Sequence, residues 1–360
     1  MHVPIAQSGL ATTGVLGVPE PELAVAITAL GEKPYRARQV LDWIYRHNAV
    51  DFAAMNNLPK ALRTRLAESW HVYESTVVAD RVASDGTRKL LLRWADGTTS
   101  ECVLIPDEER RTACISTQVG CPVGCRFCAS GIDGLQRQLT AAQIVEQAMR
   151  VRALCGDGPR LSNVVFMGLG EPLANYRNTV TALRILNDAH GMHIGARKMT
   201  VSTVGLPDAM HRLAEEGLQI TLALSLHAPT DELRRELIPW AERVTIAALI
   251  EACGYYFAKT GREVTLEYVL LGGVNDSADH ARQVAVLCRD MRANVNLIRY
   301  NPVAGLPYTR PTSESAQTFL EILRERGVTT HLRRSRGLDI EGACGQLRRR
   351  FGEQGADAAQ

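Results

Sequence analysis

The fold of this chain is most constrained by a regular alternation of apolar, strand-like runs and amphipathic, helix-like runs after residue 111. Repeated strand–helix units at this spacing predict a parallel sheet, and six or more of them favour a closed or partly closed barrel. In such barrels the chemistry lies where strands end and loops begin. We expect strands at 113–116, 163–167, 198–202, 219–225, 263–271, 294–300 and 328–333, and helices at 140–153, 175–189, 207–216, 245–260, 277–293 and 312–326.

The first hundred residues are organised differently. Residues 1–20 are rich in Gly, Ala and Thr without periodicity, so we expect a flexible tail. A helical pattern runs from 21 to 70, and from 73 to 106 the period changes to that of strands joined by tight turns. The sequence therefore predicts an α/β protein in four parts: a tail (1–20), an N-terminal accessory domain with a small helical module and a β-hairpin (21–100), a partial (β/α)6 barrel (101–348) and a second tail (349–360).

The composition indicates a soluble protein of a reducing compartment. A chain of 360 residues with 46% hydrophobic content is long enough for a large packed core. It has no run of eighteen apolar residues and no signal-peptide pattern at its start, so we expect a cytoplasmic protein that does not bind membranes. Nine cysteines in such a chain favour metal or redox chemistry over a disulfide scaffold.

The charged residues give a weaker indication of a polyanionic partner. The formal net charge is +2, and only five of the 41 basic residues are lysines. Arginine suits phosphate and base-edge recognition, but codon bias would give the same excess, so both interpretations stay open. The candidate phosphate contacts, for each of which a solvated surface is the default, are Arg36, Arg38, Lys60, Arg63, Arg65, Arg197, Lys198, Arg333, Arg334 and Arg336.

Three cysteines are concentrated in eight residues directly after a predicted strand. Cys121, Cys125 and Cys128 have the spacing C-x3-C-x2-C. A structural zinc site normally needs four Cys or His ligands, whereas three thiolates on a [4Fe–4S] cluster leave one iron open for a small molecule. The spacing resembles the signature of the radical S-adenosylmethionine (SAM) superfamily. That resemblance implies a [4Fe–4S] cluster and SAM as cofactors, held in a barrel of the predicted kind.

The ends of later strands supply candidate SAM ligands. The strand at 163–167 ends in a Gly-x-Gly-Glu-Pro run, where glycines allow close backbone approach and the carboxylate of Glu171 can accept hydrogen bonds from an ammonium group. Resemblance to the superfamily assigns this run to the SAM amino group. The complete set of candidate SAM-binding residues is Gly170, Glu171, Ser202, Ser225, Leu226, His227 and Asn301. Each of the polar residues could instead cap a helix or stabilise a turn.

From about residue 33 to 348 the chain resembles the RNA adenine methyltransferases called RlmN and their resistance-conferring relatives called Cfr. The supporting stretches are 35–43, 57–62, 85–90, 101–106, 114–128, 167–173, 225–229 and 342–347. Carbon 2 of adenine is electron-poor, so an ordinary nucleophilic methylation fails there and a carbon radical is required. The resemblance implies that Cys344 carries the methyl group as S-methylcysteine, that Cys114 resolves the protein–RNA link through a transient disulfide, and that Glu101 is the proton acceptor.

The same resemblance implies the substrates and partners. These are an adenine in the peptidyl transferase centre of 23S rRNA, the adenine beside the anticodon of certain tRNAs, and a flavodoxin- or ferredoxin-type electron donor. Two SAM molecules are consumed per methylation, and we expect a monomer. Three alternatives stay open: Cfr-type methylation of carbon 8, a glycyl-radical activase that shares the triplet, and a non-enzymatic RNA-binding iron–sulfur or zinc protein. Leu338 departs from the acidic residue usual in RlmN at that position.

Overall fold

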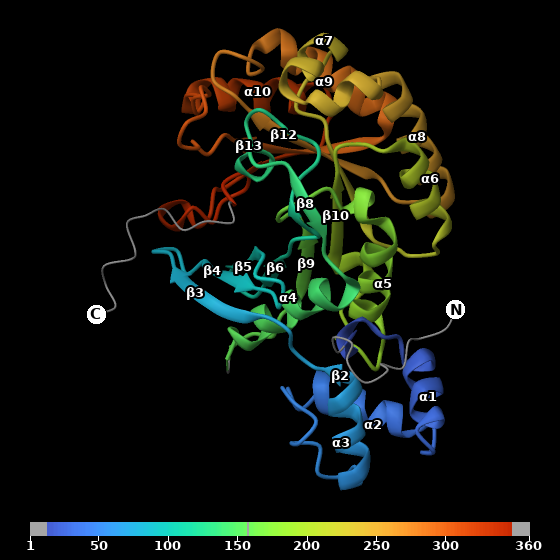
Figure 1. The fold of residues 1–360 in the computed structure, drawn as a ribbon. Helices are drawn as coiled ribbons and strands as arrows, with labels where there is room; N and C mark the ends of the chain where they lie inside the picture. Colours follow the sequence, from blue (N-terminus) through green and yellow to red (C-terminus); the bar gives the residue numbers. More distant parts are fainter. Residues whose placement is uncertain (1–12, 157, 348–360) are drawn as a thin grey trace, which may run out of the picture.

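The computed structural model describes residues 13–156 and 158–347. Figure 1 shows a small helical module at one end of the molecule, joined to a much larger unit in which helices surround a curved sheet. The tail expected at 349–360 lies outside the described residues. So do residues 1–12 of the tail expected at the N-terminus.

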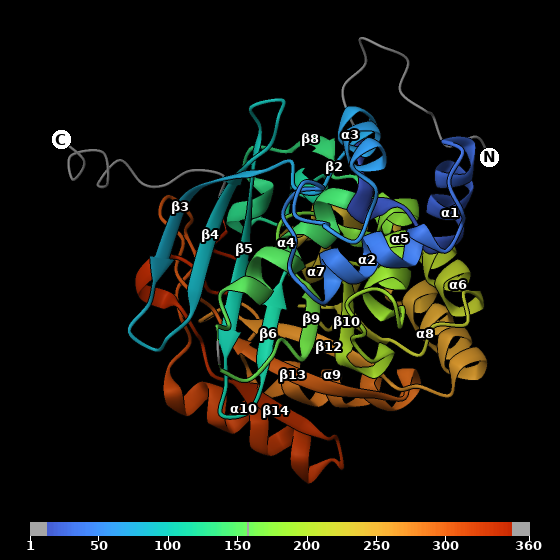
Figure 2. The ribbon, with the colours of Figure 1, turned by 90° about the horizontal axis from the view of Figure 1, so that it is seen from below.

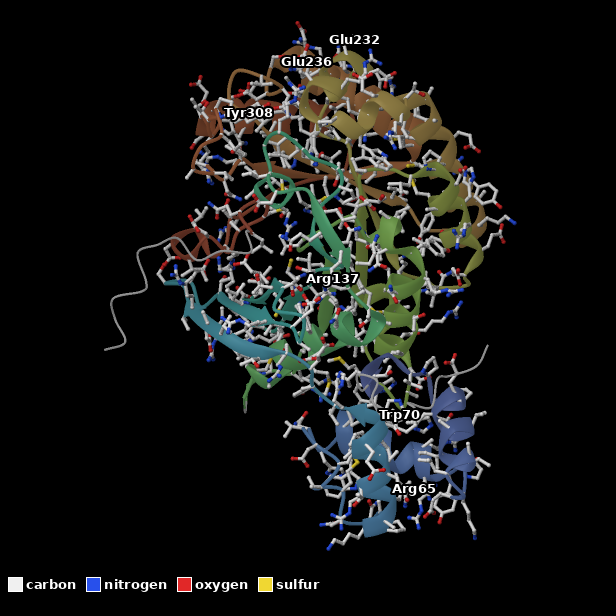
Figure 3. All side chains as sticks on the ribbon, viewed as in Figure 1. Arg65, Trp70, Arg137, Glu232, Glu236 and Tyr308 are labelled. Atoms are coloured by element: carbon white, nitrogen blue, oxygen red, sulfur yellow. The ribbon has the colours of Figure 1, made fainter. Side chains whose placement is uncertain are left out.

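The helical module consists of α1 (Glu20–Ala29), α2 (Arg36–Tyr45) and α3 (Lys60–Ser69). Trp70 is only 2% exposed and lies at the junction with the barrel, whereas Arg65 lies at the outer end of the module (Figure 3). The expectation of a flexible tail is wrong for residues 13–20. Here β1 (Thr13–Gly14) pairs with β2 (Trp70–His71), and the segment that follows buries Val15 and Leu16 in the core.

The main sheet has ten strands in the order β14-β13-β12-β11-β10-β9-β6-β5-β4-β3. Seven of them are mutually parallel, and their bounds are β6 (Arg111–Cys114), β9 (Asn163–Phe166), β10 (Met199–Thr203), β11 (Thr221–Ser225), β12 (Val264–Leu270), β13 (Ala293–Arg299) and β14 (Thr330–Arg333). The helices between them are α4 (Ala141–Ala153), α5 (Tyr176–Asn187), α6 (Pro207–Glu215), α8 (Ile246–Thr260), α9 (Ala278–Met291) and α10 (Ser313–Glu325). Six strand–helix units and a final strand confirm the predicted partial (β/α)6 barrel.

The helices begin where their capping residues predict. The capping side chains accept a hydrogen bond from the backbone N–H of the residue three positions later, and they are Thr140, Thr245, Ser277 and Thr312. Such caps satisfy backbone N–H groups that have no partner inside the helix. A seven-residue helix between β11 and α8, α7 (Asp231–Leu237), was not predicted.

The remaining strands of the large sheet are antiparallel and extend it beyond β6 (Figure 2). They are β3 (Thr76–Val82), β4 (Arg88–Arg93) and β5 (Thr99–Pro106). Because β5 pairs directly with β6, the sheet runs without interruption from the accessory strands into the barrel. The domain boundary expected between residues 100 and 101 therefore falls inside β5.

A further correction concerns the strand before the cysteine triplet. The strand at 111–114 does not deliver the triplet directly, because a short strand, β7 (Gln118–Gly120), intervenes and pairs with β8 (Leu135–Gln138). This hairpin is fastened to the accessory sheet by Arg137, which forms an ion pair with Asp96 (Figure 3). The triplet thus lies in a loop whose two ends are held together.

No helix in the described part of the chain is long and apolar enough to cross a membrane.

Candidate active site

A pocket with a cavity volume of about 140 Å³ opens at the carboxyl ends of the parallel strands. This is where ligand sites of open and closed α/β sheets form. Most of the residues singled out in the sequence meet there. The pocket is lined by Cys121, Cys125, Cys128, Gly170, Glu171, Ser202, Ser225, His227, Asn301 and Cys344, among others.

The loop that carries the triplet is closed at its base by a tight contact between two glycines. Gly120 has φ +81°, and a Cβ atom there would lie 1.9 Å from the carbonyl oxygen of Gly134. The same carbonyl accepts a hydrogen bond from the backbone of Cys121, at 3.1 Å. Only glycine fits this close approach, which sets where the first cysteine leaves the hairpin.

The three thiols face the same pocket but do not converge on one point. Within residues 13–156 and 158–347, no three His, Cys, Asp or Glu side chains gather closely enough to hold a single metal ion. Three thiols on one loop facing one pocket fit a cluster, which spreads its thiolates over several irons. Burial raises the pKa of Cys121 to about 12 and also raises the pKa of Cys125 and Cys128. The thiols are therefore protonated until a metal displaces their protons.

Apolar side chains shield this loop. Val123 and Phe127 are 4% and 5% exposed and pack with Val204, Leu237 and Tyr300 in one hydrophobic cluster. The ring of Phe127 also meets the imidazole of His227 edge-on, with 5.0 Å between centroids. The loop is thus enclosed on its protein side by groups that exclude water.

A buried arginine beneath the loop was missed at the sequence level. Arg234 on α7 is fully buried and donates hydrogen bonds to the carbonyls of Leu226 and Val204. Burial lowers its pKa to about 10, and among the described residues its Nη1 has no hydrogen-bond partner. Burial raises the pKa of Cys125, and the positive charge of Arg234 acts in the opposite direction. The run Asp231–Leu237 looks like an exposed charged helix, so nothing in the sequence indicates this role.

Glu171 lies just after β9, with its carboxylate inside the pocket and only 3% of the residue exposed. Its Oε1 accepts from the backbone of Leu173 at 2.9 Å, and its Oε2 accepts from the backbone of Val204 at 2.7 Å. Burial outweighs these hydrogen bonds and raises its pKa to about 7. A buried carboxylate on the edge of titration favours a cationic ligand, because an ammonium group would restore its charge.

The other candidate SAM ligands are placed as follows. Ser202 and Ser225 line the pocket with their hydroxyl oxygens 3.2 Å apart. His227 accepts a hydrogen bond at Nδ1 from the backbone of Val269, and burial lowers its pKa to about 3, so it is a neutral donor at Nε2. Leu226 is not among the lining residues, because its side chain lies in the main core.

Asn301 holds the segment that carries Cys344. Its Nδ2 donates to the carbonyl of Cys344 at 3.1 Å, and its Oδ1 accepts from the hydroxyl of Ser335 at 2.7 Å. The next residues of the same segment contact the triplet loop: Ala129 donates its backbone N–H to the carbonyl of Gly345 at 2.8 Å. Cys344 is thereby placed beside the cysteine loop, although more than two hundred residues separate them.

Cys344 lines two pockets at once. The second pocket, with a cavity volume of about 60 Å³, also contains Cys114 at the end of β6, together with Arg333, Arg334 and Arg336. Cys344 is exposed where the two pockets meet, and the protein atoms around its thiol partly exclude water and raise its pKa to about 11. Burial likewise raises the pKa of Cys114 to about 12. Both are free thiols, so the disulfide expected between them is not formed in this structure.

Glu101 does not line either of these pockets. It lies on β5 on the same face as Val103 and Ile105, because successive strand residues alternate. Val103 packs with Cys114 in a small cluster, so Glu101 lies on the face that leads to the second pocket. Its carboxylate is fully buried and forms an ion pair with Lys89 on β4, 3.0 Å between Nζ and Oε1.

The comparisons with known proteins agree along most of the chain. Residues 13–72 match the family described as the ribosomal RNA large subunit methyltransferase N-terminal domain, and residues 115–284 match the radical SAM superfamily. A probable dual-specificity RNA methyltransferase RlmN from Rhodopirellula baltica is 46% identical over 90% of this chain and 87% of its own length. A dual-specificity RNA methyltransferase RlmN from Halorhodospira halophila is 44% identical over 92% of each chain. The chain belongs to the RlmN family.

A solved structure extends this likeness to three dimensions. The crystal structure of a radical SAM methyltransferase from Sphaerobacter thermophilus is 46% identical, with a TM-score of 0.92, over 94% of this chain and 100% of that one. Membership of the RlmN family gives the cofactors as a [4Fe–4S] cluster and SAM, which confirms the prediction from the triplet. The match at 13–72 covers the helical module, which a glycyl-radical activase does not require.

The basic residues expected to contact a polyanion are spread over this RlmN-family structure: the helical module, the second pocket, and the turn before β10 that carries Arg197 and Lys198. Arg36 and Arg38 in the helical module pair with Glu32 and Glu20. Arg334 and Arg336 lie around the second pocket, which continues into an open depression also lined by Arg110; Arg336 and Arg110 both pair with Asp107 there. Positive charge therefore surrounds the entrance on the Cys114 side.

Proposed function

We propose that the protein methylates carbon 2 of an adenine in 23S rRNA, within the peptidyl transferase centre, and of the adenine beside the anticodon of tRNAs. The observation that carries the proposal is the position of Cys344 at the junction of two pockets. One pocket contains the cysteine triplet and Glu171; the other contains Cys114 and has a basic entrance. A carrier of a one-carbon group between a cofactor and a substrate needs access to both.

The first pocket has the groups that the two cofactors need. Cys121, Cys125 and Cys128 would hold the cluster, and Glu171 would accept hydrogen bonds from the SAM ammonium group. We further assign Gly170, Ser202, Ser225, His227 and Asn301 to SAM binding, whereas Leu226, whose side chain lies in the core, would help by positioning its neighbours Ser225 and His227. When bound, the cluster and SAM supply first a methyl group for Cys344 and then a 5′-deoxyadenosyl radical that removes hydrogen from it, so two SAM molecules are consumed.

The chain's own residues perform the remaining steps. The thiolate of Cys344 accepts the methyl group, and after hydrogen removal its methylene carbon bonds to carbon 2 of the adenine. Glu101 takes the proton from carbon 2, and the unpaired electron of the adduct would return to the cluster. The thiolate of Cys114 then attacks the sulfur of Cys344 and forms a disulfide, breaking the bond from that sulfur to the transferred carbon, which takes up a proton to become the methyl group. An external reductant must restore both thiols, and a flavodoxin- or ferredoxin-type protein supplies electrons to the cluster.

The second pocket is suited to an extruded base. RNA adenines are normally stacked or paired, so chemistry on a ring carbon requires the base to leave the stack. Ile105, Val165 and Met167 give this pocket an apolar wall, while Arg334 and Arg336 at its entrance suit the phosphates on either side of a flipped nucleotide. The relatives described above are dual-specificity RNA methyltransferases, which supports RNA as the substrate class.

The test is anaerobic reconstitution followed by reaction with SAM and unmodified 23S rRNA or tRNA. Nucleosides are then identified by mass spectrometry against 2-methyl and 8-methyl standards. We expect 2-methyladenosine from both RNAs, and none from Cys344→Ala. Formation of 8-methyladenosine would instead identify the Cfr-type reaction, which Leu338 leaves as the second candidate. Full activity of Cys344→Ala would overturn the proposed mechanism.

A further inference from the structure

Lys89 is a buried lysine that contacts two parts of the chain far apart in sequence. It lies on β4 with only 2% of its side chain exposed. Its Nζ is 3.0 Å from Oε1 of Glu101 on β5, and it also donates to the carbonyl oxygen of Glu341 at 3.1 Å. One ammonium group therefore joins the accessory sheet to the segment that carries Cys344.

This segment crosses from the end of β14 to the accessory strands and is fastened there at three points. The backbone of Gly337 donates to Asp85 at 3.0 Å, and the backbone of Ser84 donates to Asp339 at 2.8 Å. Lys89 makes the third contact, at Glu341, where the backbone has a positive φ of +51°. A non-glycine residue in this conformation is held there by its surroundings. The contact lies three residues before Cys344.

Stability alone does not explain an ion pair in this position. Removing two charges from water costs about as much as their attraction returns, and apolar replacements of buried pairs are often as stable. Both members of this pair are almost completely buried. A geometric role accounts for the charge, because an ammonium group can orient a carboxylate and a backbone carbonyl together, which an apolar side chain cannot do.

We propose that Lys89 is a positioning residue that fixes Glu101 relative to the Cys344 segment. The inference rests on the proposed function, in which Cys344 delivers carbon and Glu101 accepts a proton at the same adenine. Without Lys89 the segment loses that one of its three contacts with the accessory strands which lies nearest to Cys344, and Glu101 loses a charged partner. The step in which both residues act on RNA is then impaired, whereas the methylation of Cys344, which needs only the first pocket, continues.

The test compares Lys89→Met and Lys89→Arg with Arg88→Met as a control. Arg88 is the preceding residue on β4, half-exposed and paired with Asp80. With reconstituted enzyme, we measure kcat and KM for RNA, and S-methylation of Cys344 by peptide mass spectrometry. For Lys89→Met we expect kcat to fall by about tenfold or more, with KM within about threefold and Cys344 methylation within about twofold of wild type. Lys89→Arg should keep part of the wild-type kcat, and the control Arg88→Met should keep all of it.

Loss of folding is controlled with the double variant Lys89→Met/Glu101→Leu, which replaces both charges with apolar groups. We expect it to fold, bind the cluster and methylate Cys344, yet to form almost no methyladenosine. Wild-type kcat in Lys89→Met, or a loss of Cys344 methylation in parallel with turnover, would overturn the positioning role. That result is distinct from failure of the proposed function, which would appear as activity in Cys344→Ala.

Discussion

Arg333 at the end of β14 pairs with Glu267 on β12, with 3.7 Å between Nη1 and Oε2. Glu267 lines the first pocket, and Arg333 lines the second, so the pair bridges the place where the pockets meet. Burial works against the charge of Arg333, but Glu267 and the thiols of Cys344 and Cys114 raise its pKa. Burial raises the pKa of both thiols, and the positive charge of Arg333 acts in the opposite direction.

Replacing Arg333 with methionine should therefore make Cys344 less reactive. The pKa of the thiol is about 11 and is raised by burial, so only a small thiolate fraction exists near neutral pH. Loss of the guanidinium raises that pKa further, and each unit lowers the thiolate fraction about tenfold. The measurement is the rate of iodoacetamide alkylation of Cys344 between pH 7 and 9, followed by peptide mass spectrometry of cluster-free protein.

Arg334→Met is the matched control, because Arg334 lines the same pocket and follows directly in sequence. We expect its alkylation rate to match wild type. Equal rates in Arg333→Met and Arg334→Met would show that Arg333 does not act on this thiol.

Glu171 predicts a pH dependence of SAM binding. Burial raises its pKa to about 7, so the carboxyl is largely protonated below that pH, and an ammonium group then loses its acceptor. Affinity should weaken by about tenfold per unit as the pH falls below 7. This affinity is measured by equilibrium dialysis of SAM with the reconstituted enzyme between pH 5.5 and 7. Glu171→Gln should bind SAM weakly, and its affinity should not change with pH in this range.

The raised pKa of Glu171 also makes the stability of the protein depend on pH when SAM is absent, and this dependence runs opposite to that of SAM binding. Because the folded state holds the proton more tightly than the unfolded chain, it binds more protons between pH 4.5 and about 7. The contribution of Glu171 to stability is therefore present at low pH and is lost as the pH rises through this window. Glu171→Gln lacks this contribution. A free energy of unfolding that falls more steeply with rising pH in Glu171→Gln than in wild type would contradict this assignment.

The hairpin before the triplet gives a structural prediction. In Gly120→Ala, the new methyl group would lie 1.9 Å from the Gly134 carbonyl, and φ is +81°, so the loop must move. We expect the variant to fold but to lose most of its iron after reconstitution, measured by iron and sulfide analysis. Gly134→Ala is the control: φ is +64°, and nothing lies within 4 Å of the added Cβ, so it costs about 1–2 kcal/mol of strain and keeps its iron.

Long periodic elements were predictable from the sequence, and short polar ones were not. Thr140, Thr245 and Thr312 stand at the predicted helix starts and are the N-caps of α4, α8 and α10. A helical period over thirteen or more residues with a capping residue is a strong local signal. The strands β7 and β8 have only three and four residues, and α7 has seven, so neither the period nor the hydrophobic pattern could identify them.

The candidate site was predictable where its residues share a motif or follow a strand. The triplet and Glu171 are of this kind, and the topology of a parallel barrel brings them together. The roles of Lys89 and Arg234 could not be recognised, because a single charged residue in a strand or helix normally faces solvent. Their importance depends on partners such as Glu341 or Cys125, whose proximity arises only from the tertiary fold. Arg333 was expected as a phosphate contact, whereas the structure pairs it with Glu267.

The last prediction concerns Cys114 and the release of product. Cys114 is 8% exposed and lines the second pocket with Cys344. In Cys114→Ala the methylene link between Cys344 and adenine can form, but no thiol is present to break it, so a covalent protein–RNA species should accumulate. Denaturing gels measure this species, and mass spectrometry after nuclease digestion should find the modified adenosine on the Cys344 peptide. Cys102→Ala is the control, since Cys102 lies on the opposite face of β5 in the main core. Multiple turnovers by Cys114→Ala without a covalent species would exclude Cys114 as the resolving thiol.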